Sequence, residues 1–527
     1  WAALRSIYGG ALDLRQSDGA PGPIKAGPFV GEHDWQNGPD RDRQNVILCA
    51  GRKQVANILS DWSNFTTEEQ LRRVEPNSGP IFVTQQPDNG YRNEKLAAAG
   101  LDYPAEAHAT NSILMAYGED AGFAAGYAAG VDVLAVAKAA ATRAAQLVAK
   151  EAGDAAAARA DAAIAAGADP VVARAQAQAV ADAAAAAARR PTFKMELRRQ
   201  YLLPALGGLC RRWYGLPDDR HMLAQGWGWE EIVAAGDAER ASGDDSLTRT
   251  HAHCPGDFLS PSRNAFYPRP GKQVEAFAQS HGRAILDAAT AFVTENRAAG
   301  GPQQGSVARA MFGAIADDEV LARNLIGTMV GAIPPMDGNL RGILAEWLGE
   351  KSLWRHQAAL RAALRGQAAS TDFAAARAVL YGPVSQAMCK RPAPDLLYRT
   401  ATGKAAIEVG NDAKQRHGAV DVETCEGDLI VVSLVSASQR SLKAADTGGM
   451  GDVGIVFGGR RRAADQGYQM VDGSAVPDPQ PDIYAPVHAC PAQDMAMGAI
   501  MGIMAALLDA GTIQAQPASL IVRFSDW

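Results

Sequence analysis

Apolar residues recur at helical spacing along most of the chain, and this spacing predicts long helices. We expect helices at about residues 53–61, 193–217, 271–298, 305–330, 340–366, 371–389 and 492–509. Short runs of apolar and β-branched residues at 45–49, 428–434 and 521–524 predict strands. The pattern therefore indicates a mainly α-helical fold with a small β component.

One tract, residues 124–189, differs from the rest because alanine dominates it and charged residues are spaced regularly along it. Alanine has the highest helix propensity, so the tract predicts two or three helices, with breaks at 153–154 and 167–170. We interpret it as a helical insertion that packs on the body or binds a partner. The resulting division is an irregular arm at 1–45, a domain formed by 46–123 and 190–527, and the insertion at 124–189.

Composition excludes several classes of protein. The 527 residues are 47% hydrophobic and 21% charged, with a formal net charge of −7, which fits a globular protein and argues against nucleic-acid binding. No run reaches the roughly 18 apolar residues of a membrane span, so we expect none. The 6 cysteines are scattered without a CxxC pair, which is typical of a cytoplasmic protein without structural disulfides.

Two motifs indicate chemistry only weakly. Residues 449–454 match the dinucleotide string GxGxxG, but an extended run follows instead of a helix, so we interpret them as a glycine-rich turn. His251 and His253 lie beside Cys254, but no second ligand pair follows, which makes zinc a weak hypothesis. Cys254 also remains a rival to the cysteine discussed next.

The segment 483–498 combines a cysteine with the start of a strongly apolar helix. Cys490 precedes this helix, and Pro491 lies near its first position. Unpaired backbone N–H groups at a helix start lower the pKa of a nearby thiol and stabilise its thiolate. A thiolate held in this way is a good axial ligand for haem iron, although a buried cysteine before a helix is more often a core residue.

This segment resembles the haem-binding loop of the cytochrome P-450 family, in which a cysteine lies shortly before a helix. Segments 55–65, 396–399 and 426–440 also resemble that family, in the same order along the chain. The resemblance implies a cytochrome P-450-like helical fold and haem b as cofactor, with Cys490 as the iron ligand.

The same resemblance implies further haem contacts. His488 and Arg399 correspond to groups that bind the haem propionates by charge-assisted hydrogen bonds. Residues 310–348 correspond to the long helix that crosses the haem, where Gly331 opens the distal face. Apolar residues on this helix imply an apolar organic substrate: Met329, Val330, Ile333 and Met336.

Two departures from the family pattern change the expected chemistry. Gln386 and Cys389 stand where the family has a Glu and an Arg, so the buried ion pair is absent. The haem-crossing helix has Ile333-Pro334 in place of the usual acid and threonine, and no side chain at 332–335 can relay a proton. Pro334 and Pro335 are also expected to kink this helix.

Family members without the acid and alcohol often use a peroxide, because its O–O bond already exists. The resemblance therefore implies a haem-thiolate oxidoreductase that uses hydrogen peroxide or a hydroperoxide, with Asn339 as a hydrogen-bond donor to it. One alternative is a dioxygen-dependent monooxygenase fed by a ferredoxin and its reductase, for which residues 460–462 offer three arginines. A second alternative is a haem-binding sensor without catalytic activity.

Overall fold

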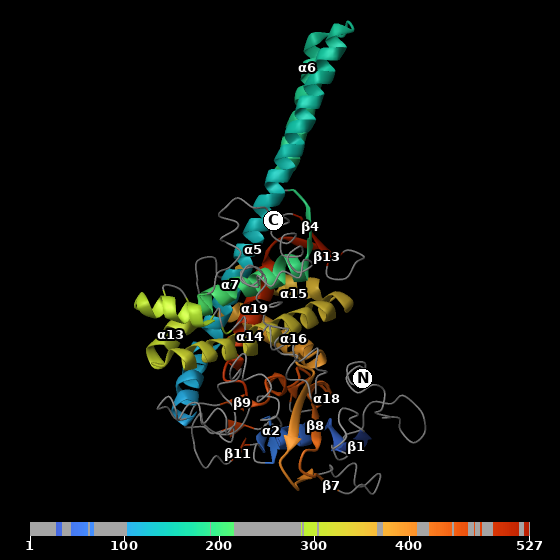
Figure 1. The fold of residues 1–527 in the computed structure, drawn as a ribbon. Coiled ribbons are helices and arrows are strands. Elements are labelled where there is room, and N and C mark those ends of the chain that lie inside the picture. The colour runs from blue at the N-terminus through green and yellow to red at the C-terminus, as the bar shows by residue number, and fades with distance from the viewer. Residues whose placement is uncertain are drawn as a thin grey trace.

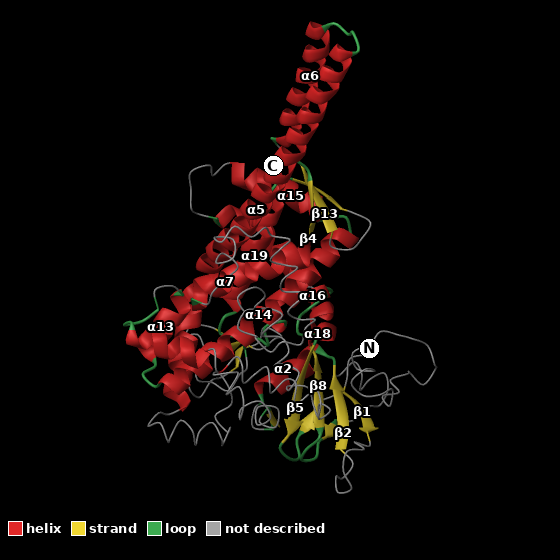
Figure 2. Ribbon diagram, turned by 45° about the horizontal axis from the view of Figure 1, so that its top comes forward, coloured by secondary structure: helices red, strands yellow, loops and turns green. Residues whose placement is uncertain are grey.

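The computed structural model describes most of the chain outside residues 216–285 and several shorter gaps. Described are residues 28–33, 44–61, 64–67, 103–189, 191–215, 286, 289–302, 305–365, 373–407, 421–444, 447–461, 468–469, 475–476, 489–515 and 521–525. Helices form the larger layer, the main sheet lies at one end of it, and a helical hairpin projects from the other end (Figures 1 and 2).

The described helices follow the predicted apolar spacing. The α-helices are α2 (Arg52–Ser60), α5 (Tyr103–Ala165), α6 (Pro170–Ala188), α7 (Leu203–Tyr214), α13 (Ser306–Ala314), α14 (Asp318–Gly349), α15 (Leu353–Arg365), α16 (Ala374–Lys390), α18 (Leu434–Ser441) and α19 (Gln493–Asp509). A short π-helix, η1 (Arg198–Leu202), precedes α7, and a short 3-10 helix, η4 (Val453–Ile455), follows α18. Asp317 caps α14 by accepting a bond from the Val320 amide at 2.8 Å, as expected for an N-cap aspartate.

The main sheet has the order β1-β2-β8-β5-β3. Its strands are β1 (Pro28–His33), β2 (Gln44–Cys49), β3 (Phe65–Thr66), β5 (Leu396–Ala401) and β8 (Leu429–Ser433). β2 and β8 pair in parallel, whereas the other neighbours are antiparallel. Segments from the two ends of the chain therefore form one sheet, and its apolar face packs with α2 in a cluster separate from the helical core.

Three smaller sheets complete the described strands. β4 (Phe193–Glu196) pairs with β13 (Ile521–Ser525), which also pairs with β12 (Thr512–Ala515). β9 (Arg460–Arg461), β10 (Tyr468–Gln469) and β11 (Ala475–Val476) form a second sheet. β6 (Ala406–Ile407) and β7 (Val422–Glu423) form a two-stranded ribbon.

Parallel helices α5 and α19 form the closest contact in the core. Gly122 and Gly126 of α5 lie against the backbone at Met495 and Ala499, and Gly498 and Gly502 of α19 lie against the backbone of α5. Glycines four residues apart lie on one helix face, so each pair removes side chains from the same contact surface. The two backbones therefore touch directly, and α19 is buried along nearly its whole length.

Beyond this contact, α5 continues into the hairpin that projects in Figure 1. Asp169 caps α6 by accepting bonds from the amides of Val171 and Val172 at 2.8 and 3.3 Å. Figures 1 and 2 show α6 running back along α5 from the tip of the hairpin toward the body. The tract 124–189 thus starts inside the core against α19 and only its remainder projects.

Several predicted boundaries were wrong. α5 runs unbroken through Gly153, because alanine-rich flanks and the packing against α6 outweigh one glycine. Residues 193–196 form strand β4 rather than the start of a helix, because they pair with β13. The gap between the helices predicted at 305–330 and 340–366 is also absent, since α14 continues through Pro334 and Pro335, in agreement with the long helix that the resemblance implied at 310–348. The segment 315–317 instead separates α13 from α14.

One described helix passes a length and hydropathy test for a membrane span, although the sequence pattern predicted none. It covers Ala109–Ala165 of α5, with a mean hydropathy of 1.3 and 39% burial in its most apolar window. The core helix of a soluble protein passes the same test, and the contact of α5 with α19 accounts for much of its apolar surface.

Candidate functional site

Cys490 lies three residues before α19 and is half-buried. Its backbone amide donates to the Phe457 carbonyl at 2.9 Å, and its own carbonyl accepts from Gln493 at 3.4 Å. The N-cap residue Ala492 offers no side-chain acceptor to the first turn of α19. The amides at this helix start are therefore available to an anion such as a thiolate.

The charge of Cys490 acts on one buried residue of α7, Tyr214. Tyr214, at the end of α7, is almost completely buried, and burial is the main reason that its pKa is raised. A hydrogen bond with Thr328 of α14 lowers this pKa, whereas the charges of Cys210 and Cys490 raise it. Tyr214 thus connects the surroundings of Cys490 with α14. Sequence reasoning missed it, because nothing in the local pattern of residues 213–215 indicates this tertiary contact.

A series of hydrogen bonds and one ion pair fix the segment 452–457, which accepts the backbone hydrogen bond of Cys490. The Phe457 amide donates to Gly454 at 3.1 Å, and the Gly454 amide donates to a carboxylate oxygen of Asp452 at 3.0 Å. The other oxygen of Asp452 accepts from Arg52 of α2 at 3.0 Å, with 19% and 13% of the two side chains exposed. An ion pair between distant segments therefore anchors the turn that holds Cys490.

Helix α16 holds the preceding glycine-rich turn through neutral groups. Gln386 donates to the Gly449 carbonyl at 3.3 Å, and Ser385 donates to the Met450 carbonyl at 3.4 Å. Cys389 is fully buried against Gly451, and burial raises the pKa of its thiol to about 12. Gln386 and Cys389 are therefore neutral residues that contact this turn. Residues 449–454 lie in a turn, as predicted when the GxGxxG match was interpreted as a glycine-rich turn and not as a nucleotide-binding loop.

We expect Asp452→Asn and Arg52→Gln to destabilise the fold through one shared interaction. A double-mutant cycle in urea should give a coupling free energy of about 1–3 kcal/mol, the range for a hydrogen bond to a charged group away from solvent. The pair Arg297–Asp318, with 33% and 50% of its side chains exposed, serves as control and should couple by about 0.5 kcal/mol or less. Equal coupling in both pairs would contradict an anchoring role for Asp452.

Arg399 lies on β5 and is 5% exposed. One guanidinium nitrogen donates to the Tyr398 carbonyl at 2.7 Å, whereas the buried Nε has no hydrogen-bond partner in the described structure. Burial lowers the pKa of Arg399 to about 10. Since an unpaired buried cation is costly, this residue is suited to receive an anionic group of a ligand.

The middle of α14 is apolar where a proton relay would be expected. Ile333 and Pro334 are buried, and Gly331 is half-buried. Prolines at 334 and 335 cannot donate backbone hydrogen bonds, so the carbonyls of Val330 and Gly331 lose their usual helical donors. This part of the helix therefore offers backbone acceptors but no acidic or hydroxyl side chain.

The structure gives Asn339 a role that differs from the predicted one. Its amide nitrogen donates to the carbonyls of Pro335 at 3.0 Å and Ala393 at 2.8 Å, and its oxygen accepts from the Ala393 amide at 3.0 Å. Both N–H groups are used, so Asn339 has no donor left for a peroxide and instead joins α14 to the segment after α16. Asp337 is likewise engaged, in ion pairs with Arg198 and Arg341.

Some predicted residues lie outside the described part of the chain. These are His488, and the alternative ligand group His251, His253 and Cys254. Within the described residues, no group of three His, Cys, Asp or Glu side chains is placed to hold a metal ion. The predicted contact of His488 with a propionate therefore stays a prediction.

Comparison with known proteins identifies the fold. No protein-family profile matches the chain, and no curated protein matches its sequence. The structure resembles the crystal structure of the cytochrome P450DA haem domain, with a TM-score of 0.50 and 12% identity over 94% of this chain and 88% of the other. It also matches P450BioI in complex with an acyl carrier protein ligated to hexadec-9Z-enoic acid, with a TM-score of 0.44, 11% identity and 91% of each chain covered. The chain thus has a cytochrome P450-like fold, as the sequence resemblance implied.

Two observations fit the haem that this fold accommodates in its relatives. Cys490 lies three residues before α19, whose N-cap residue forms no side-chain cap bond, a position that suits a thiolate ligand of iron. Arg399 is a buried cation with an unpartnered Nε, which suits a propionate carboxylate. The donor types are those that a haem with a thiolate ligand requires.

Replacing Arg399 by methionine should stabilise the haem-free protein and weaken haem retention. Removing this buried charge is expected to raise the free energy of unfolding by about 1–3 kcal/mol, because the desolvation cost of the cation outweighs the one hydrogen bond lost at the Tyr398 carbonyl. Haem transfer to apomyoglobin should be faster than from wild type. Arg355→Met, which removes an exposed arginine from α15, should change neither quantity by much. A large loss of stability in the haem-free Arg399→Met protein would contradict this assignment.

Proposed function

We propose that this protein is a haem-thiolate oxidoreductase that oxidises an apolar organic substrate with hydrogen peroxide or an organic hydroperoxide. The observation that carries the proposal is the position of Cys490 at the uncapped start of the buried helix α19, in a cytochrome P450-like fold. Haem b with a thiolate ligand supplies cleavage of the O–O bond and transfer of an oxygen atom.

The residues of the chain hold and shield this cofactor. Cys490 provides the sulfur, and the amides at the start of α19 stabilise its negative charge. The Phe457 carbonyl fixes the cysteine backbone through the bond at 2.9 Å. Arg399 pairs with a propionate, and Gly331 allows the backbone of α14 to approach the distal face closely.

The choice of oxidant follows from the groups that α14 lacks. Reduction of dioxygen requires protons delivered to the bound oxygen, but Ile333 and Pro334 are apolar and Asp337 and Asn339 are already bonded. A hydroperoxide already carries its oxygen at the peroxide level together with a proton, so it needs neither external electrons nor protons from α14 to reach that level. The overall reaction is R–H + R′–OOH → R–OH + R′–OH, in which the substrate carbon is oxidised and the peroxide is reduced.

The substrate is expected to be apolar. The four side chains Met329, Val330, Ile333 and Met336 are buried along α14, in the segment that the sequence resemblance matches to the haem-crossing helix. Such a surface gives hydrophobic contact and few polar groups for orientation. A lipid-like or terpenoid-sized molecule therefore fits better than a charged metabolite.

Spectroscopy and turnover test this proposal in sequence. The purified protein should show a red-shifted Soret band when reduced under carbon monoxide. It should then oxidise an apolar substrate with hydrogen peroxide or cumene hydroperoxide in the absence of any reductase. Turnover that requires ferredoxin, its reductase and dioxygen would instead establish the monooxygenase, and haem binding without turnover under either condition would establish the sensor.

A further inference from the structure

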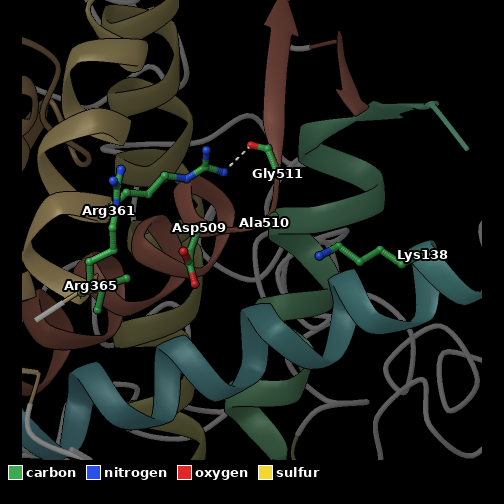
Figure 3. Close-up of a pocket in the computed structure, with 7 residues that line it drawn as sticks. Lys138, Arg361, Arg365, Asp509, Ala510 and Gly511 are labelled. Carbon is green, nitrogen blue, oxygen red and sulfur yellow. Dashed lines mark hydrogen bonds between the residues drawn. The ribbon is translucent and has the colours of Figure 1, made fainter. Parts of the chain in front are cut away.

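A pocket with a volume of about 480 Å³ lies at the end of α19 opposite to Cys490. Lys138 of α5, Arg361, Leu364 and Arg365 of α15, and residues 509–511 line it (Figure 3). The volume is in the range of small-molecule pockets, about 300–1,000 Å³. The cytochrome P450-like fold and the haem site make no use of this pocket.

Side chains of α15 hold the floor of the pocket in place. Gln357 donates to the carbonyls of Leu508 at 2.7 Å and Gly511 at 2.9 Å. Arg361 donates to the same Gly511 carbonyl at 2.7 Å, as the dashed line in Figure 3 shows. The carbonyls at the C-terminal end of α19 are therefore satisfied, and the floor is formed without a ligand.

The pocket gathers like charges. The lining includes three cations, Lys138, Arg361 and Arg365, and one carboxylate, Asp509, which leaves two net positive charges. Tyr127 donates to Asp509 at 3.1 Å, so this carboxylate is also engaged outside the pocket. Burial lowers the pKa of Lys138, the charge of Asp509 raises it, and the charge of Arg361 has a smaller lowering effect. One carboxylate thus stands against three cations, and an anion would balance the remaining positive charge.

The two arginines keep donors for such an anion. A guanidinium carries five N–H groups, and Arg361 uses one of its nitrogens on Gly511. Arg365 lies exposed in the last turn of α15. In the part of the chain that the structure describes, neither arginine forms an ion pair with a carboxylate. Planar guanidinium groups are well matched to the oxygens of a phosphate.

We propose that this pocket binds the phosphate group of a small phosphorylated organic molecule. A phosphate monoester carries a charge of about −1.5 to −2 near pH 7, which matches the two net positive charges of the pocket. A monocarboxylate would neutralise only one of them. Leu364 provides an apolar wall for the organic part of the ligand, and the pocket is larger than a phosphate ion needs.

Calorimetric titration of the full-length protein with phenyl phosphate, at constant ionic strength, tests this site. Arg365→Gln and Lys138→Gln should each weaken binding about tenfold, the loss expected for one charge-assisted hydrogen bond. Asp509→Asn should strengthen binding, because it removes the opposing negative charge. Arg355→Gln, which removes an exposed charge from the same helix outside the pocket, should leave the affinity unchanged.

Two results would overturn the assignment. Phenyl phosphate that does not bind at millimolar concentration, or that binds equally well to Arg365→Gln and Lys138→Gln, would exclude the pocket as its site. Benzoate that binds as tightly as phenyl phosphate would exclude phosphate recognition. Thermal unfolding in the presence of inorganic phosphate gives an independent measurement, since a ligand of the folded state raises its midpoint.

Discussion

Replacing Cys490 by serine is expected to abolish the red-shifted Soret band of the reduced carbon monoxide complex. Serine keeps the size and the bond from the residue 490 amide to Phe457, but its hydroxyl is not deprotonated at neutral pH and is a poor iron ligand. Peroxide-driven turnover should fall by roughly a thousandfold or more, as for other groups that act as part of a catalytic unit. Absorption spectra and turnover with cumene hydroperoxide measure both effects.

The matched control is Cys425→Ser, because Cys425 is an exposed thiol in the turn before β8. It should keep the wild-type spectrum and rate. A thiolate spectrum that survives Cys490→Ser would exclude Cys490 as the ligand and favour Cys254. This outcome would leave the cytochrome P450-like fold intact and change only the site.

Gly498→Ala should strongly destabilise the fold. A Cβ atom at this position would lie 2.8 Å from the Phe123 amide nitrogen and closer still to the Glu119 carbonyl oxygen. These are backbone atoms of α5, which cannot move aside without separating the two helices. We expect a loss of about 3 kcal/mol or more, at the upper end of overpacking effects. Because α19 follows Cys490, haem retention should fall as well.

Gly153→Ala, also on α5 but facing α6, is expected to have the opposite effect on stability. Its Cβ would lie 3.5 Å from that of Ala181, an ordinary contact, and alanine is the better helix former. This substitution should stabilise the protein by about 0.5–1 kcal/mol. Urea unfolding of both variants measures the contrast. Similar losses for Gly153→Ala and Gly498→Ala would show that backbone contact between α5 and α19 is not the cause.

Periodicity predicted the existence of most described helices, because an apolar stripe reflects the face that packs. It placed α2, α16, α19 and strand β8 within a few residues of their observed bounds. Local signals misled where tertiary contacts decide the conformation. Residues 193–196 form a strand only because β13 lies beside them, and α14 tolerates two prolines because it is packed along most of its length.

The site was less accessible from sequence than the fold. Cys490 stands out because a cysteine before an apolar helix is a local pattern. The ion pair between Arg52 and Asp452 joins residues 400 positions apart, so no local pattern reports it. Asn339 is polar and lies one turn beyond the prolines, which favoured a role as hydrogen-bond donor to a peroxide. Only the structure reveals that its side-chain amide both donates to and accepts from the backbone of Ala393.

The length of the hairpin formed by α5 and α6 is expected to be variable without effect on the rest of the fold. Past the glycine contacts with α19, its two helices pack mainly on each other, so each added turn contacts only its immediate neighbours, as in repeat proteins. Equal segments can therefore be gained or lost from both helices without disturbing the helices that hold Cys490. The turn at Gly167 is correspondingly the natural point to insert a reporter domain or a fluorescent label into this protein.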